Sequence, residues 1–210
     1  MNLVVVGATG RTGSQVVEQA LERGHRVTAL ARRPEQVSLR HDRLVTVAVD
    51  VFDAARLVEV LSGADAVVSA LGIGSSRQVT TVYSDGTANL LRAMQHHDVM
   101  RLAVVSAAPA GPREQQPFLE RRVAMPILDR IFGATYADMR RMEELLHRCD
   151  RAWVALRPPR LVDREATGRY RIDAQPLPKG RTITIPDLAT ALLAAVDQQE
   201  LHGHALYVAA

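Results

Sequence analysis

The chain opens with MNLVVVGATGRTG, residues 1–13, in which an apolar run is followed at once by three evenly spaced glycines. Residues 2–6 are short, apolar and rich in valine, which is typical of a buried strand. The apolar run begins so early that we expect no targeting sequence before it. The residues after Gly13 place apolar side chains at helical spacing. The opening therefore predicts a strand, a glycine turn and a helix.

The three glycines, Gly7, Gly10 and Gly13, form a GxxGxxG pattern between that strand and that helix. The first turn of a helix has unpaired amides and a positive dipole end, so it can bind a diphosphate where no side chain blocks the approach. Gly7 would permit the tight turn, Gly10 the close approach and Gly13 the packing of helix on strand. In register with further strand and helix units, the pattern predicts dinucleotide binding. The alternative is a glycine-rich turn without a ligand.

The rest of the chain alternates short apolar runs with longer segments of helical periodicity. The runs lie at residues 27–30, 44–49, 66–71, 102–107 and 153–156. Such alternation predicts an α/β fold with a doubly wound, mostly parallel sheet. With 210 residues and 47% hydrophobic content, one core can be filled, so we expect a single domain over residues 1–210.

Residues 109–133 depart from this rhythm. They are rich in proline and charge and continue into FLERRVAMPILDRIF, residues 118–132, which predicts a broken amphipathic helix with Pro126 in its middle. We interpret the segment as an insertion after the fifth strand. Such insertions lie beside the ligand crevice of a doubly wound sheet. A substrate lid, a dimer face and simple core packing all remain open.

Composition excludes several classes of function. The net charge is only +3, aromatic residues make up 4%, and no basic cluster alternates with aromatics, so we expect no nucleic-acid partner. No apolar run approaches the roughly 18 residues of a membrane helix, so we expect no membrane partner and a cytoplasmic location.

The single cysteine, Cys149, cannot form an intramolecular disulfide. The histidine pairs at 96–97 and 202–204 lack a third ligand, so no metal site is expected.

The end of the second strand predicts which cofactor is preferred. NAD sites hold a carboxylate there for the ribose hydroxyls, whereas this chain has Arg32 and Arg33. A guanidinium matches a phosphate dianion, so NADPH is expected over NADH. The alternative is a surface role for both arginines. After the third strand, Asp50 and Val51 fall where the adenine would lie, and the Asp50 carboxylate could accept from its exocyclic amine. The alternative is that Asp50 only begins a helix.

Five motifs occur in a fixed order: GATGRTG (7–13), VDV (49–51), SALG (69–72), VVSA (104–107) and RPPRLVD (157–163). With them the chain resembles the atypical short-chain dehydrogenases/reductases of the NAD(P)H-binding, NmrA-like kind, and among these the biliverdin reductase B and flavin reductase group. The resemblance runs from Asn2 to about Val208. It implies a Rossmann fold with a small substrate-side region.

The resemblance also implies a set of site residues. Around the diphosphate it places Thr9, Gly10, Arg11 and Thr12, and at the 2′-phosphate Arg32. Beside the ribose it places Ala70, Leu71 and Gly72, and beside the nicotinamide Ser106, Pro158, Pro159 and Arg160. Biliverdin reductases have histidine at the position of Arg160. This departure argues against tetrapyrrole turnover more than against cofactor binding.

The implied chemistry needs few protein groups, because the cofactor carries the hydride. Ser106 would position the nicotinamide or an acceptor oxygen, and Arg160 would stabilise developing negative charge. The alternatives are a satisfied strand-end hydroxyl for Ser106 and a surface ion pair for Arg160. A rival general acid is Tyr136, four residues before Arg140, where related enzymes use Tyr-x-x-x-Lys. Arginine cannot give up its proton in that role.

The sequence thus predicts an NADPH-dependent reductase of a flavin, a quinone or a related aromatic or conjugated small molecule, as a monomer or homodimer. Two alternatives stay open. One is a regulatory protein that senses the nicotinamide cofactor without catalysis. The other is a nucleotide-sugar epimerase or dehydratase, which is disfavoured because the carboxy-terminal part is short.

Overall fold

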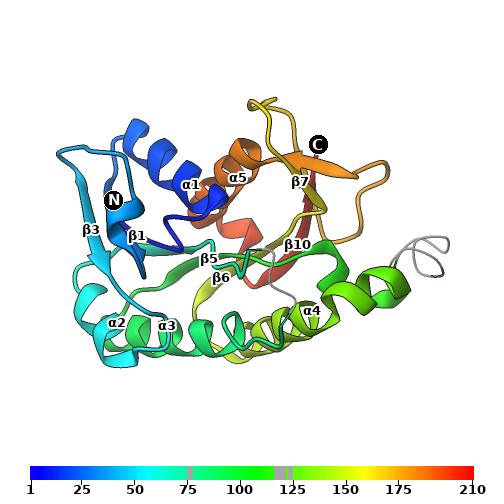
Figure 1. Cartoon of the computed structure of the whole chain (residues 1–210), viewed down its shortest axis with the longest axis horizontal. Coiled ribbons are helices and arrows are strands. Elements are labelled where there is room, and N and C mark those ends of the chain that lie inside the picture. The colour runs from blue at the N-terminus through cyan, green and yellow to red at the C-terminus, as the bar shows by residue number, and fades with distance from the viewer. Residues whose placement is uncertain (75–77, 116–121, 123–124) are drawn as a thin grey trace.

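Eight strands form one sheet in the order β3-β2-β1-β4-β5-β6-β10-β8, as the computed structural model shows (Figure 1). The structure describes residues 1–74, 78–115, 122 and 125–210. The strands are β1 (Asn2–Val6), β2 (Arg26–Ala31), β3 (Leu44–Ala48), β4 (Ala66–Ser69), β5 (Arg101–Val105), β6 (Ala152–Arg157), β8 (Arg171–Asp173) and β10 (His204–Ala209). All neighbouring strands are parallel except β8, which runs antiparallel to β10. The predicted Rossmann fold is confirmed.

Helices cover both faces of this sheet (Figure 1). They are α1 (Arg11–Glu22), α2 (Ala54–Val60), α3 (Ser84–His96), α4 (Met125–Arg148) and α5 (Ile185–Asp197), with 3₁₀ turns η1 (Pro34–Gln36), η2 (Ala108–Ala110), η3 (Arg113–Gln115) and η5 (Gln199–Leu201). Helices α1 and α5 lie on one face, and α2, α3 and α4 on the other. A small parallel pair, β7 (Arg160–Val162) and β9 (Thr182–Thr184), stands apart from the main sheet.

The position of β1 explains its unbroken apolar run. Leu3 and Val5 face the core beneath α1 and α5, whereas Val4 and Val6 face the core beneath α2, α3 and α4. A central parallel strand is buried on both faces, so it needs apolar residues at every position rather than at every second one. Strand order also reverses at β1, which pairs with β2 on one side and β4 on the other. Ligands of such sheets bind at the carboxyl ends of the strands beside this switch point.

Helix α4 contains the second half of the segment predicted as a broken helix with Pro126 in its middle, and most of the first half lies outside the described residues. The helix begins at Met125 and continues through Gly133 to Arg148, so the proline lies in its first turn. The first four N–H groups of a helix have no intrahelical partner, and a proline there removes no hydrogen bond. Residues 116–121 and 123–124 of the predicted insertion lie outside the described residues. Within the described residues, no helix has both the length and the apolar character needed to span a bilayer.

Candidate active site

The glycine turn joins β1 to α1 at the centre of the carboxyl edge. Gly7 has a φ of +77°, and a Cβ on it would lie 2.6 Å from the Ala70 carbonyl oxygen at the end of β4. A Cβ on Gly13 would lie 2.1 Å from the Gly7 oxygen, so this glycine lets α1 pack against the turn. Gly10 is the N-cap of α1 and provides no side-chain acceptor. The first-turn amides of α1 are therefore open to an anion.

A cavity of about 700 Å³ lies over this turn. Every residue predicted to bind the cofactor lines it except Gly13, which packs beneath it: Gly7, Thr9, Gly10, Arg11, Thr12, Arg32, Arg33, Asp50, Val51, Ala70, Leu71, Gly72, Ser106, Pro158 and Pro159. The topology explains this grouping, because the parallel strands β1, β2, β4, β5 and β6 all end at one edge. The volume fits a small-molecule or cofactor site.

The charges of this cavity suit an anionic ligand. Arg11, Arg32 and Arg33 line it, and Asp50 is the single acid among its described lining residues. The side chains of Arg32 and Arg33 form no hydrogen bond or ion pair with the described residues. The Asp50 carboxylate accepts a hydrogen bond of 3.0 Å from the Phe52 amide, and Asp53, not Asp50, caps α2. The alternative of Asp50 as a helix-capping residue is therefore wrong.

Sequence reasoning missed two residues that bring the helices to the cavity. Tyr83, which precedes α3, and Met139 of α4 both line it. Burial is the main cause that raises the pKa of the Tyr83 phenol. In the sequence both residues belong to ordinary helical apolar patterns. Nothing in those patterns distinguishes them from core residues, because only the docking of the helices brings them to the cavity.

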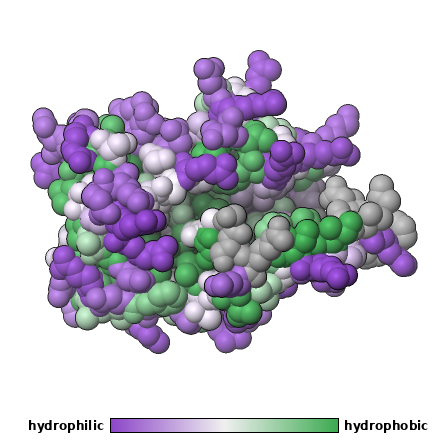
Figure 2. All heavy atoms as spheres, viewed as in Figure 1, coloured by the Kyte–Doolittle hydropathy of each residue, from purple (hydrophilic) through white to green (hydrophobic). Residues whose placement is uncertain are grey.

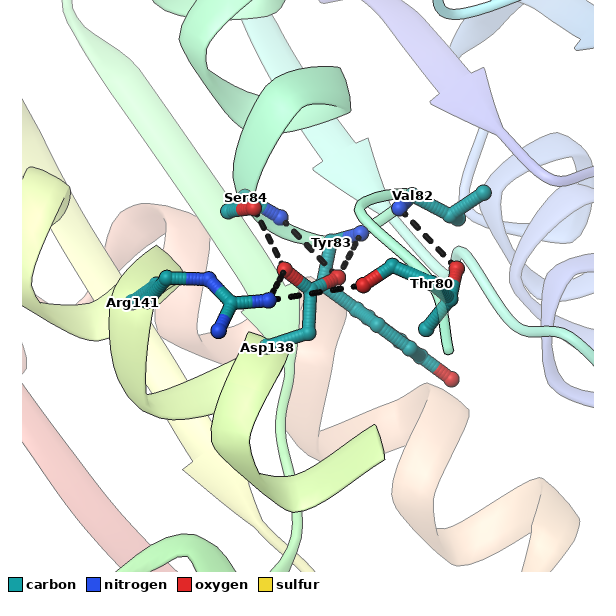
Figure 3. Close-up of polar contacts among 6 residues, drawn as sticks. All are labelled: Thr80, Val82, Tyr83, Ser84, Asp138 and Arg141. Carbon is teal, nitrogen blue, oxygen red and sulfur yellow. Dashed lines mark hydrogen bonds and ion pairs between the residues drawn. The ribbon is translucent and has the colours of Figure 1, made fainter. Parts of the chain in front are cut away.

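Asp138 of α4 fixes the start of α3 beside Tyr83 (Figure 3). The Tyr83 amide donates to its Oδ2 at 2.9 Å, and the Ser84 amide and hydroxyl donate to the same carboxylate. Arg141 Nη2 lies 3.0 Å from its Oδ1. Asp138 is fully buried. Its carboxylate accepts from the unpaired amides at the start of α3, and its negative charge is favoured at this positive end of the helix dipole. The contact holds α4 against the cavity wall.

Ser106, directly after β5, belongs to a second buried polar network. Its hydroxyl donates to Glu143 Oε1 at 2.7 Å. Arg157, at the end of β6, binds the same carboxylate through Nε at 3.0 Å and Nη2 at 2.6 Å. Burial disfavours the charge of Arg157, but the hydrogen bonds and charge of Glu143 outweigh it and raise the pKa of the guanidinium. The ion pair is thus doubly hydrogen-bonded and shielded from water.

A second cavity, of about 960 Å³, adjoins the first. Ala107, Pro158 and Pro159 line both, so the two meet at the end predicted to hold the nicotinamide. The amides of Ser106 and Ala108 bind the carbonyls of Leu156 and Pro158 at 2.7 and 2.8 Å, which fixes this shared wall. Figure 2 shows a hollow on this face, with hydrophobic residues gathered along its α4 side.

Arg160 and Tyr136, both predicted as catalytic, line the second cavity only. Arg160 is exposed and forms no ion pair with Asp163 or Glu165. Burial, and then the charge of Asp129, raises the pKa of Tyr136. This is the opposite of the change that a cationic neighbour produces in a tyrosine general acid. No group of three or more histidine, cysteine, aspartate or glutamate residues in the described part of the chain could hold a metal ion.

Comparison with known proteins agrees with this geometry. A family model described as NAD(P)H-binding matches residues 7–199. The 4-hydroxy-tetrahydrodipicolinate reductase of Natronomonas pharaonis is 46% identical over 68 residues, which are 32% of this chain and 24% of that protein. The photosystem II assembly factor Ycf39 of a Synechocystis species is 28% identical over 123 residues, which are 57% of this chain and 38% of that protein. The chain thus spans less than half the length of either relative.

Solved structures share the whole fold. The oxidoreductase ylbE of Lactococcus lactis has a TM-score of 0.84 at 22% identity, with 100% of this chain and 90% of that chain covered. A candidate NADH-flavin reductase of Streptococcus pneumoniae has a TM-score of 0.79 at 23% identity, with 100% and 99% covered. A candidate NAD-dependent epimerase/dehydratase of Bacillus halodurans has a TM-score of 0.81 at 23% identity, with 100% and 94% covered. At these identities the likeness shows the fold alone.

Proposed function

Because the chain belongs to the NAD(P)H-binding family, we propose that it is an NADPH-dependent reductase that transfers hydride to a flavin, a quinone or a related conjugated acceptor. One observation carries the proposal. A basic cavity over a glycine turn and a larger, mostly apolar cavity meet at Ala107, Pro158 and Pro159. We infer that the two cavities are open to each other beside these three residues, so that ligands bound in them can come into contact, as direct hydride transfer requires.

The residues present fit the dinucleotide. The uncapped first turn of α1 would hold the diphosphate, because a Cβ at Gly7 or Gly13 would fill the space that the turn needs. Arg32 and Arg33 would bind the 2′-phosphate as charged hydrogen-bond donors, which favours NADPH over NADH. When bound, the cofactor supplies the hydride.

Ser106 would orient the nicotinamide rather than donate a proton. Its hydroxyl hydrogen is committed to Glu143, so its oxygen lone pairs are left to accept from an amide N–H of the carboxamide. Pro158 and Pro159 would cover the ring and exclude water. Arg160, on the acceptor side, would stabilise negative charge on the acceptor as it is reduced. Solvent would provide the accompanying proton.

The test is direct. Pure protein is mixed with NADPH and, separately, with FMN, riboflavin or a quinone, and the loss of nicotinamide absorbance is followed. We expect turnover with at least one acceptor and faster turnover with NADPH than with NADH. Tight NADPH binding by calorimetry without oxidation across the panel would overturn the reductase and favour the sensing alternative.

A further inference from the structure

We propose that the acceptor carries a carboxylate or phosphate beside its conjugated ring, and that Lys179, Arg181 and Arg160 bind this anionic group. The inference rests on the proposed function. It names the class of substrate that would bind in the second cavity, here called the acceptor cavity; the first is called the cofactor cavity. Three features support it: the charge of the cavity wall, the apolar body of the cavity and the backbone that presents Lys179.

The wall of the acceptor cavity is one-sided in charge. The whole chain has 26 lysines and arginines against 23 aspartates and glutamates, close to balance. The described lining of this cavity nevertheless contains Arg157, Arg160, Lys179 and Arg181 and no acid. Glu143 neutralises Arg157. The other three side chains form no hydrogen bond or ion pair with the described residues, so their charge is available to a ligand.

The body of the same cavity is apolar. Leu128, Tyr136, Leu177 and Tyr207 line it together with several prolines. A fully hydrophilic anion would leave this surface without a partner, and a fully apolar ligand would leave three cations facing it. A flat conjugated ring with an acidic substituent satisfies both.

Two of the cations are held by the small sheet. Arg160 begins β7 and pairs in register with Thr182 of β9, and Arg181 immediately precedes Thr182. The pairing therefore brings the two arginines to the same end of this sheet. That end lies beside Pro158 and Pro159, the wall shared with the cofactor cavity.

Lys179 is presented by a strained turn. It is the only lysine in the chain, and its φ of +62° lies in the left-handed region that favours glycine. The turn is closed by hydrogen bonds from the Gly180 amide to the Leu177 carbonyl at 3.0 Å and from the Arg181 amide to the Lys179 carbonyl at 2.9 Å. A Cβ on Gly180 would lie 2.7 Å from Ala209 Cβ, so the turn sits tightly on β10. Lys179 therefore has a strained backbone conformation at the cavity wall and carries the positive charge that an anionic ligand needs, which together indicate a binding role.

The experiment compares FMN with riboflavin, which share one ring system and differ by a phosphate. Protein saturated with NADP⁺, so that the cofactor cavity is filled, is titrated with each flavin while flavin fluorescence is recorded. We expect FMN to bind on the order of tenfold more tightly, with the difference shrinking as salt is raised, because added ions screen the charge. Equal affinities at low salt would overturn the inference.

Variants separate charge from folding. Lys179→Gly and Arg181→Gln should each weaken FMN several-fold and leave riboflavin unchanged. Lys179→Gly also relieves the left-handed strain, so its melting temperature should hold or rise while FMN affinity falls. Arg148→Gln, at the exposed end of α4, makes the same charge change away from the cavity and should alter neither flavin.

NADPH oxidation by both flavins is measured in parallel. A preference for FMN in binding without any oxidation would support the anion site and overturn the reductase. Oxidation of both flavins with equal affinity, and with no effect of Lys179→Gly, would support the reductase and overturn the anion site.

Discussion

Ser106 and Glu143 lie 37 residues apart in the chain and meet in a buried hydrogen bond of 2.7 Å. Ser106 is 2% exposed and Glu143 is 5% exposed, so water does not compete for this contact. A carboxylate can only accept, and the serine must therefore be the donor. The direction of this bond turns Ser106 into an acceptor toward the cofactor cavity.

Replacing Ser106 with alanine should lower turnover modestly. The variant loses one acceptor toward the nicotinamide and leaves one oxygen of Glu143 without its serine, while the ion pair with Arg157 stays. A neutral hydrogen bond contributes about 1 kcal/mol, which corresponds to roughly a fivefold loss of kcat/KM. Steady-state kinetics with NADPH and FMN measure it. A full rate would show that the hydroxyl is structural only, and a loss of many orders of magnitude would show that it transfers a proton.

Replacing Glu143 with alanine should destabilise the protein far more than it would at an exposed position. Arg157 is 7% exposed and would keep its charge without a partner, which typically costs about 3–5 kcal/mol. Glu143→Gln retains one acceptor and should cost less. Glu144→Gln, next to it but exposed, is the matched control and should be near neutral. Urea unfolding of the three variants gives the comparison, and equal stabilities would contradict a structural ion pair.

The sequence carries the cofactor side of this site well, because the requirement there is local. Glycine is needed at positions 7 and 13 because neighbouring backbone atoms lie too close for any side chain there. A residue that directly follows a parallel strand must lie at the carboxyl edge that these strands share. Identity and order of residues are enough for both inferences. This is why Arg32 can be placed at the cavity from the sequence alone, whereas the role of Ser106 beside the nicotinamide came from the resemblance to a known family.

The helix side could not be predicted in the same way. Glu143 and Asp138 stand in α4 among charged residues that look like a solvated face. Their partners Arg157 and Ser84 are 14 and 54 residues away and become partners only when α4 docks. The turn at Lys179 has no periodicity, so its left-handed backbone and its place on the acceptor cavity depend on packing against β10.

Replacing Arg32 and Arg33 with alanine should weaken NADPH by on the order of 2 kcal/mol or more and leave NADH nearly unchanged. Charged hydrogen bonds to the 2′-phosphate would be lost, and NADH has no such group. Calorimetric titration with both cofactors measures the effect. Arg26→Ala, exposed at the opposite end of β2, is the control and should bind both as before. Equal weakening of the two cofactors would show that the arginines do not bind the 2′-phosphate.

The Asp187 carboxylate should make the free energy of unfolding depend on pH in the acidic range. Burial alone would raise the pKa of this carboxyl, but hydrogen bonds from Thr167, Thr184 and Gly168 outweigh it and lower the pKa below the ordinary value of 3.8. A lowered folded-state pKa contributes stability that is fully present above the unfolded pKa and is lost as pH falls through the folded one. The difference in unfolding free energy between the wild type and Asp187→Asn should therefore be constant near neutral pH and shrink below about pH 4. Urea titrations from pH 7 to pH 3 measure it, and a difference that grows in acid would contradict this assignment.

Two glycine-to-alanine changes should act in opposite directions on folding. At Gly13 the new Cβ would lie 2.1 Å from the Gly7 oxygen, a backbone atom that cannot move without opening the turn. We expect a loss of about 2 kcal/mol or more in unfolding free energy, in the range of severe overpacking, together with a loss of NADPH binding.

Gly133 lies inside α4, and there the nearest atom to a new Cβ is Asp129 Cβ at 3.8 Å. Alanine in a helix interior is favoured over glycine by about 0.5–1 kcal/mol, so Gly133→Ala should raise the melting temperature and leave NADPH affinity unchanged. Thermal unfolding with and without NADPH compares the two, because only the turn beneath the cofactor cavity couples the glycine to ligand binding. If Gly13→Ala folded and bound NADPH as the wild type does, the turn could not be the diphosphate site.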